Sequence, residues 1–193
     1  MIFTSILLLV LAATLAAGES YTLTAHAPAN RAIHGARINA SGRRLLVGLD
    51  APSSYCPDLP HIVCPAGTST TVDEDLTHLR VSTPGGQAIY VAPDGVVSYT
   101  AAHSAYMPPG STTKGFYAKT MASSCSAERT EMLDFLSVDG ADKGLFACPN
   151  PDLAGTWVLV AAGRESRALK GDCVVLEGLE LRRSEVEIGA WQY

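Results

Sequence analysis

Beyond residue 18, the apolar residues occur in short runs rich in β-branched and aromatic side chains, separated by polar turn signals. Runs of this length and composition favour β-strands over helices. The predicted strands cover residues 21–27, 45–49, 79–82, 88–92, 96–100, 145–148, 157–162 and 174–181. Residues 130–135 and 165–170 are each predicted to form one helical turn, too short for a core helix. The pattern predicts an all-β fold, either a closed barrel or a sandwich of short strands.

The clearest local unit is a hairpin over residues 87–100. Two apolar runs flank Pro93-Asp94-Gly95, where Pro presets φ and Gly supplies the positive φ of a tight turn. The longest region without obvious strands, residues 101–131, is too long for a structureless loop inside a compact domain. Residues 115–119 are its best strand candidate, and the rest is expected to be an exposed excursion.

A weak internal repeat links residues 41–47, 85–91 and 141–147. Each segment has a turn followed by a short apolar run. A β-trefoil-like arrangement would produce such a threefold pattern. Any all-β protein also repeats turns and strands, so both interpretations stay open.

The N-terminus carries an uncharged apolar run from Ile6 to Ala17. This run is shorter than the roughly 20 residues that a membrane-spanning helix needs. Small residues at Ala16 and Gly18 fit the cleavage pattern of a secretory signal, although the usual basic start is missing. The alternative is a buried N-terminal helix. We expect a signal peptide over residues 1–18, followed by a single disulfide-stabilised all-β domain over residues 19–193 that is secreted and not membrane-bound.

Secretion would place the five cysteines in an oxidising compartment, where disulfides persist. An odd number allows at most two bridges within one chain. Cys56 and Cys64 could close a local loop, and a bridge from Cys148 to Cys173 would tie the late strands together. Cys125, in a serine-rich stretch, is expected to be unpaired, which allows a monomer or a Cys125-linked dimer. Sequence alone does not prove this connectivity.

Charge and composition limit the classes of partner. The net charge is −5, only 17% of residues are charged, and no basic cluster occurs. Nucleic acids and anionic membranes are therefore poor candidates, because binding them needs concentrated Lys and Arg. Asn39-Ala40-Ser41 is an N-glycosylation sequon in a predicted turn, so a glycan is expected to fit at Asn39.

Catalytic and metal-binding motifs are not evident. The spacing of the histidines fits no standard metal motif, and no C-x-x-C occurs, so neither metal nor cofactor is expected. No nucleophile elbow of G-x-S-x-G type is present, and Cys125 has no nearby His or Lys. The acidic run Asp73-Glu74-Asp75 is interpreted as a solvated loop. An extracellular hydrolase stays open as an alternative, because two facing carboxylates need no local motif.

Aromatic residues gather in one part of the chain and are the candidates for surface binding. These candidates are Tyr90, Tyr99, Tyr106, Phe116 and Tyr117, together with His103 between two tyrosines. Outward-facing rings could stack on sugars or dock a protein, which would make the protein a carbohydrate-binding module for wall polysaccharide. Strand alternation predicts that about half of them face the core.

Several short phrases in order resemble a family of secreted ascomycete IgE-binding proteins. They lie at residues 38–42, 54–57, 63–67, 86–91, 94–100, 102–110, 144–149 and 190–193. Residues 147–150, Trp157 and Asp172-Cys173 are similar, more distantly, to the fungal cell-wall protein PhiA. The resemblance implies a small extracellular or wall-associated protein without known enzymatic activity, some members acting as elicitors or effectors toward plants.

The resemblance also bears on the cysteines. Cys56, Cys64, Cys148 and Cys173 occupy family positions, which supports the two pairings, whereas Cys125 departs from the pattern. The resulting hypothesis is a non-catalytic secreted fungal protein, wall-associated or released. It would act through its surface, in the manner of an effector, elicitor or antigen, on cell-wall polysaccharide or a host extracellular protein.

Overall fold

The computed structural model describes residues 19–122, 129–137, 140, 144–161 and 172–193. Within them the chain forms β-strands and no helix, so no helix of this part is available to cross a membrane. The all-β prediction is confirmed. The strands are β1 (Tyr21–His26), β2 (Arg37–Ser41), β3 (Arg44–Val47), β4 (His78–Leu79), β5 (Gln87–Val91), β6 (Val97–Tyr99), β7 (Phe116–Ala122), β8 (Arg129–Phe135), β9 (Leu145–Pro149), β10 (Trp157–Ala161), β11 (Val174–Leu176) and β12 (Gly178–Arg183). The predicted signal peptide and the predicted turn at 165–170 lie outside the described residues.

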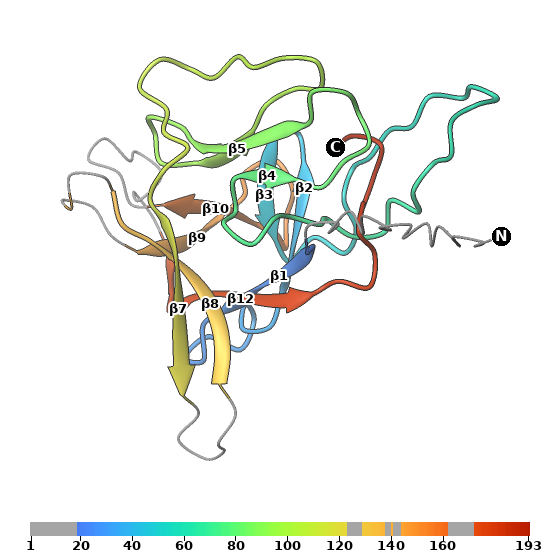
Figure 1. Cartoon of the computed structure of the whole chain (residues 1–193). Coiled ribbons are helices and arrows are strands. Elements are labelled where there is room, and N and C mark those ends of the chain that lie inside the picture. Colours follow the sequence, from blue (N-terminus) through green and yellow to red (C-terminus); the bar gives the residue numbers. More distant parts are fainter. Residues whose placement is uncertain (1–18, 123–128, 138–139, 141–143, 162–171) are drawn as a thin grey trace, which may run out of the picture.

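The strands form one curled antiparallel sheet in the order β11-β9-β10-β3-β2-β1-β12-β8-β7 (Figure 1). The sheet branches at β3, where Leu46 and Val47 pair with β10 while Arg44 pairs with Ser98 of β6. From β6 the second branch continues to β5 and β4. Both branches contribute side chains to one core, so the curled sheet resembles half of a barrel.

The suspected threefold repeat does not extend to the strand pairing. The three repeated segments contain β3, β5 and β9. β3 pairs with β2, β6 and β10, β5 pairs with β4 and β6, and β9 lies between β10 and β11. These environments are not equivalent, so no threefold symmetry relates the described strands.

The predicted hairpin over residues 87–100 is confirmed as β5 and β6. Gly95 has φ +86° and donates its N–H to the Ala92 carbonyl at 2.8 Å, and Val96 N–H donates to Asp94 Oδ1 at 3.1 Å. A second hairpin joins β2 to β3 through Gly42 and Arg43, both with positive φ as a two-residue turn requires. β2 itself was not predicted, although its sequence, Arg37-Ile38-Asn39-Ala40-Ser41, alternates between polar and apolar residues.

The helical turn predicted at residues 130–135 is wrong, because this segment belongs to β8. β8 pairs with β7 from Phe116 opposite Phe135 to Ala122 opposite Arg129. This pairing satisfies the backbone along the whole segment and buries Leu133 and Phe135 in the core, which an isolated helical turn would not achieve. The strand predicted at residues 115–119 is confirmed as part of β7, which continues to Ala122.

The single strand predicted at residues 174–181 is instead two strands. β11 pairs with β9, and β12 pairs with β1 and β8. The break falls at Glu177, directly before Gly178, the first residue of β12, which has φ +152°. A Cβ at this position would lie 3.0 Å from the Leu133 carbonyl oxygen, so the chain changes partners where only glycine fits.

Two apolar clusters hold the sheet together. The main core fills the inside of the curled sheet, with Leu45, Leu159 and Leu179 fully buried. A smaller cluster of Leu46, Cys148, Val158 and Val160 lies on the other face of β3, β9 and β10. Because β10 contributes to both clusters, its continuous apolar sequence is that of a strand buried on both faces.

The C-terminal residue is anchored inside the fold. The Tyr193 hydroxyl donates to the Ser69 carbonyl at 2.7 Å, and its backbone N–H donates to Gln87 Oε1 at 2.8 Å. Gln87 Nε2 donates in turn to the carbonyls of Tyr193 and Thr100, both at 2.9 Å. The fully buried Gln87 amide thus joins the C-terminus to the β5–β6 hairpin.

Alkaline pH is expected to destabilise the protein through two tyrosines. Burial raises the pKa of Tyr99 and of Tyr193 to about 12, although hydrogen bonds from the Arg43 and Thr71 N–H groups oppose the shift. The unfolded chain loses these protons near pH 10, so the stability present below pH 10 should decline between pH 10 and 12. Tyr99 alone should account for ~1–3 kcal/mol.

Urea denaturation of thiol-alkylated protein between pH 8 and 12 checks this. Tyr193→Phe should reduce the slope of stability against pH, and Tyr106→Phe, at an exposed position, should not. A flat profile through pH 12 would show that the phenols ionise in the folded protein as they do in the unfolded chain.

Candidate functional site

The predicted aromatic binding surface does not form. Tyr90 and Tyr99 are 7% and 1% exposed, so their assignment to a surface site is wrong. The Tyr99 hydroxyl instead accepts a hydrogen bond from Arg43 N–H at 3.2 Å inside the fold. Phe116 packs edge-on against Phe135, with ring centroids 5.4 Å apart, and is half-buried against the core. Tyr99 and Phe116 therefore pack with the main core, and Tyr90 is buried as well.

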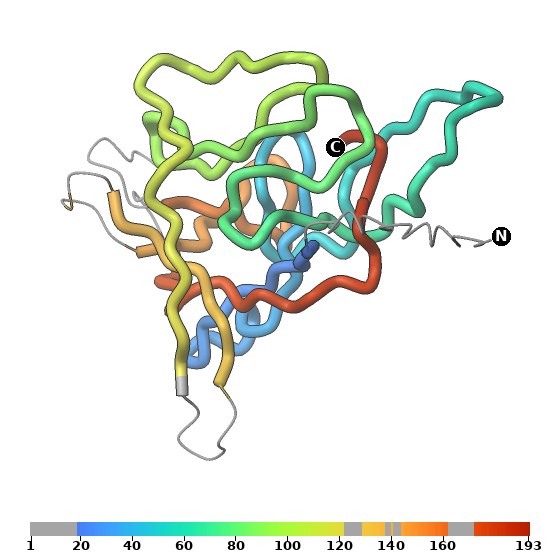
Figure 2. The backbone as a smooth tube through the Cα atoms, viewed as in Figure 1, coloured from blue at the N-terminus to red at the C-terminus, as the bar shows by residue number. Residues whose placement is uncertain are grey.

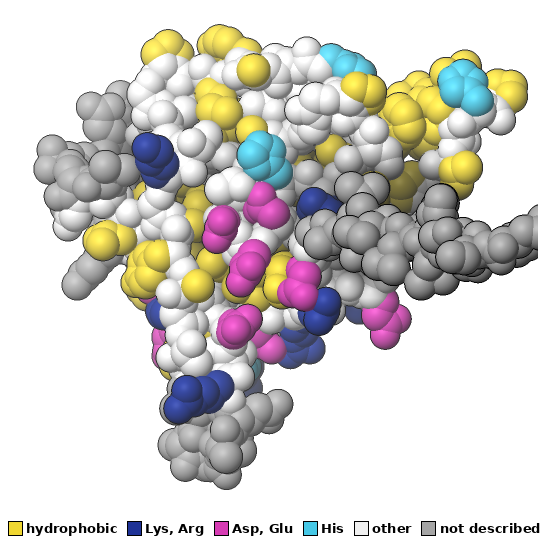
Figure 3. All heavy atoms as spheres, viewed as in Figure 1, with side chains coloured by type: hydrophobic (Ala, Val, Ile, Leu, Met, Phe, Trp, Pro, Cys, Tyr) yellow, Lys and Arg dark blue, Asp and Glu magenta, His cyan; other side chains and the backbone are white. Residues whose placement is uncertain are grey.

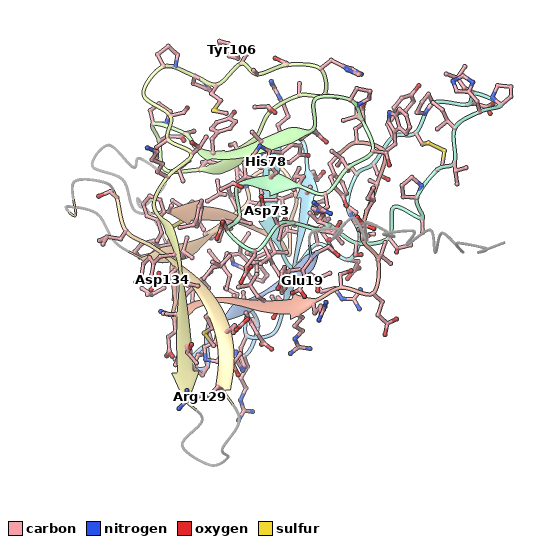
Figure 4. All side chains as sticks on the ribbon, viewed as in Figure 1. Glu19, Asp73, His78, Tyr106, Arg129 and Asp134 are labelled. Atoms are coloured by element: carbon pink, nitrogen blue, oxygen red, sulfur yellow. A yellow bond between two sulfur atoms is a disulfide. The ribbon has the colours of Figure 1, made fainter. Side chains whose placement is uncertain are left out.

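The remaining candidates are exposed but do not share one surface. Tyr106 is 68% exposed on the long loop after β6. The Tyr117 hydroxyl lies 3.4 Å from Asp134 Oδ2 on the β7–β8 hairpin, and Figure 4 shows Asp134 well away from Tyr106. His103 adopts positive φ, with Nε2 3.4 Å from the Thr83 hydroxyl. The structure does not bring these residues together.

Among the described residues, the most prominent exposed apolar feature is the disulfide loop, residues 56–64, closed by the Cys56–Cys64 bond. It projects from the body of the protein in Figure 2, and Figure 3 shows apolar side chains gathered over it. Val63 is 89% exposed, Tyr55 at its base 59% and Leu59 47%. Such a concentration of exposed apolar side chains is typical of a protein-interaction surface.

The base of the disulfide loop is held by the C-terminal segment. Tyr55 and Gln192 exchange backbone hydrogen bonds of 3.0 and 3.2 Å, and Gly67 N–H donates to the Gly189 carbonyl at 3.0 Å. A Cβ on Gly67, which has φ +66°, would lie 2.6 Å from Ser54 Oγ. The loop is therefore presented from a fixed base. Sequence reasoning predicted its disulfide but missed its exposed apolar surface, for which the apolar residues between the two cysteines were the available signal.

Asn39 lies in β2 and not in the turn expected from the sequon. It is 2% exposed, its Nδ2 donates to the Leu49 carbonyl at 2.7 Å, and its Oδ1 accepts from Thr70 N–H at 2.9 Å. An N-linked glycan is attached through Nδ2, which is occupied and buried here. The expected accommodation of a glycan at an exposed turn is therefore wrong.

The second disulfide joins Cys148 at the end of β9 to Cys173 just before β11. Both disulfides join the cysteines that the sequence paired. Cys125 lies outside the described residues, so its free thiol and a Cys125-linked dimer stay predictions.

Two titratable clusters outside the loop were not anticipated. Asp73 accepts hydrogen bonds from both the N–H and the hydroxyl of Thr77, and His78 Nδ1 lies 3.0 Å from the same hydroxyl. The carboxylate thus closes the turn before β4, and Figure 4 shows Asp73 beside His78. His78 Nδ1 also lies 3.5 Å from Asp73 Oδ2, and the His78 side chain is largely exposed, so the pair lies at the surface of this turn.

The other cluster pairs His26 and His34 edge-to-face at 4.9 Å, with His26 Nε2 3.8 Å from Glu177. His34 Nδ1 accepts the Ala27 N–H at 3.3 Å, which uses one of its ring nitrogens. In the described part of the chain, no group of three or more metal-ligating side chains is placed to hold a metal ion.

Comparisons with known proteins place the chain among secreted proteins. A family model described as "PhiA-like secreted protein" matches residues 21–193. An "Uncharacterized secreted protein" of Arthroderma benhamiae is 31% identical over 174 residues, which cover 89% of this chain and 84% of the relative. No solved structure matches. Neither description mentions IgE binding, so the comparisons support the more distant of the two resemblances.

Proposed function

This chain belongs to the PhiA-like secreted protein family, and on that premise we propose that it is a non-catalytic fungal protein that binds another extracellular protein. Its location outside the cell follows from the family. The partner belongs to the host or to the cell wall, and the disulfide loop is the contact surface.

The projecting disulfide loop is the observation that supports this proposal. The exposed side chains of the loop and of its base are mainly apolar, with Tyr55, Leu59 and Val63 prominent among them. Tyrosine is enriched at protein interfaces, where its ring packs and its hydroxyl bonds at the rim. Closure by the disulfide reduces the conformational freedom that binding would otherwise remove, which favours affinity.

A carbohydrate-binding module has less support as an alternative. The tyrosines and Phe116 that suggested stacking on sugar rings are divided between core and separate surfaces. The hydrolase alternative likewise has no catalytic family behind it, because neither the family nor the relative is described by an activity.

A pair of double variants tests the binding role. Leu59→Ser/Val63→Ser in the disulfide loop should weaken partner binding at least ~10-fold, or about 1.4 kcal/mol, because interface centres depend on a few buried apolar side chains. Leu153→Ser/Val175→Ser, at exposed apolar positions elsewhere, should bind as the wild type does.

The measurement is quantitative capture from wall extract and host extracellular fluid, followed by surface plasmon resonance with the purified partner. Equal losses in both double variants, or none in the loop variant, would remove the loop from the proposal. Turnover of a glycan, ester or peptide that one point substitution abolishes would overturn the non-catalytic role.

A further inference from the structure

We propose that a polar pocket on the outer face of β2, β1 and β12 binds a carboxylated sugar, a hexuronic acid. This outer pocket encloses about 400 Å³, within the range of small-molecule sites. It goes beyond the proposed function, because it uses none of the disulfide loop. Its polar lining includes Thr22, Thr24, Arg37, Thr68, Ser69 and Arg182.

Strand register places the polar side chains of the outer pocket in one layer. Thr24 of β1 lies opposite Arg37 of β2, and Thr22 lies opposite Arg182 of β12. Leu23, between the two threonines, is buried in the main core. Because successive side chains of a strand alternate between faces, the threonines and arginines project from the other side of the sheet.

The floor and one wall of the outer pocket are held in place without a ligand. Thr70 N–H donates to Asn39 Oδ1 at 2.9 Å, and the Thr70 hydroxyl accepts the Ala40 N–H at 2.7 Å. The neighbouring Ser69 carbonyl accepts the hydrogen bond from Tyr193. These bonds tie Ser69 and Thr70 to the C-terminal residue and to β2, so this wall of the pocket is preformed.

The charges of the outer pocket favour an anion. Arg182 Nε donates to Glu180 Oε1 at 2.9 Å, which leaves its charge partly compensated. The Arg37 side chain is exposed and makes no hydrogen bond or ion pair with the described residues. A guanidinium presents parallel N–H donors that match the two oxygens of a carboxylate. Arg37 is therefore the group that would bind the acid.

The hydroxyls of the outer pocket favour a sugar over a simple anion. Thr68 and Ser69 make no side-chain hydrogen bond among the described residues, so both hydroxyls are available to a ligand. No aromatic ring lines the pocket, which disfavours neutral sugars that are held mainly by stacking. A ring carrying several hydroxyls and one carboxylate satisfies both the charge and the hydroxyl pattern.

Titration of the ¹⁵N-labelled secreted protein by NMR tests this. Glucuronate and galacturonate are the probes, and glucose, galactose and inorganic phosphate are the controls. Comparing the affinity for trigalacturonate with that for galacturonate shows whether the pocket binds a residue of a polymer or the free sugar acid. The amide signals of Thr24, Arg37 and residues 68–70 should shift with the uronates. Equal binding of the neutral sugars, or of phosphate, would overturn the proposal.

Arg37→Gln should weaken uronate binding ~10-fold or more, and Thr68→Ala should weaken it without removing a charge. Arg129→Gln is the matched control, because Arg129 lies at the far end of β8 in Figure 4. Both pocket residues are exposed, so the variants should keep the wild-type melting temperature. Unchanged affinity of Arg37→Gln for the uronates would exclude Arg37 as the carboxylate-binding group and overturn the proposal.

Discussion

Replacing Asn39 with alanine is expected to lower the free energy of unfolding by about 2–4 kcal/mol. The substitution removes both hydrogen bonds of a buried amide and leaves the Leu49 carbonyl and the Thr70 N–H without their partner. Because Thr70 also supports Ala40 N–H, the loss should loosen the connection between β2 and residues 68–70. Urea denaturation measures the change.

Ser41→Ala is the matched control, because it destroys the sequon and leaves the Asn39 amide intact. Ser41 loses only one exposed hydroxyl contact, 2.8 Å to Ser53, so its stability should stay within about 1 kcal/mol of the wild type. The masses of the secreted wild-type protein and the secreted Ser41→Ala variant should differ by the Ser-to-Ala change alone. Loss of a glycan mass in Ser41→Ala would show that Asn39 is modified and contradict the buried position.

Removal of the Cys148–Cys173 disulfide should cost about 3–4 kcal/mol, against about 2–3 for Cys56–Cys64. The first bond closes a sequence separation of 25 residues and the second only 8, and longer closed loops restrict the unfolded chain more. Cys148 is also buried in the smaller cluster with Leu46, Val158 and Val160, so its loss affects packing as well.

Paired Cys→Ala variants test this ranking by urea denaturation under non-oxidising, non-reducing conditions. Cys56→Ala/Cys64→Ala should remain folded but bind the protein partner more weakly, because its loop loses closure. Cys148→Ala/Cys173→Ala should be less stable with the disulfide loop unaffected. A larger loss from the Cys56–Cys64 pair would mean that this loop supports the core and does not only present a surface.

Local patterns predicted those features that neighbouring residues decide. The β5–β6 hairpin follows from Pro93-Asp94-Gly95, because proline and glycine restrict their own backbone angles wherever they stand. The all-β class follows from short β-branched runs between turns. The resemblance to PhiA likewise carried enough specific positions to indicate a secreted protein, which the family match supports.

Other predictions failed because the deciding contacts are distant in sequence. The segment of β8 has the composition of a short helix, and seven residues of pairing with β7 override it. Asn39 stands beside a turn signal and Tyr99 near the end of a predicted strand, yet their buried partners come from Arg43, Leu49 and Thr70. Propensity is a weak prior against such tertiary contacts.

By itself, the sequence determined most of the strand-forming segments, the tight turns and the cysteines available for pairing, because these depend on local backbone chemistry. The tertiary structure alone decided which face of each strand is buried, since one residue of register exchanges the inner and outer side chains. The outer pocket illustrates this, because Arg37, Thr68 and Arg182 meet only after β2, β1 and β12 align.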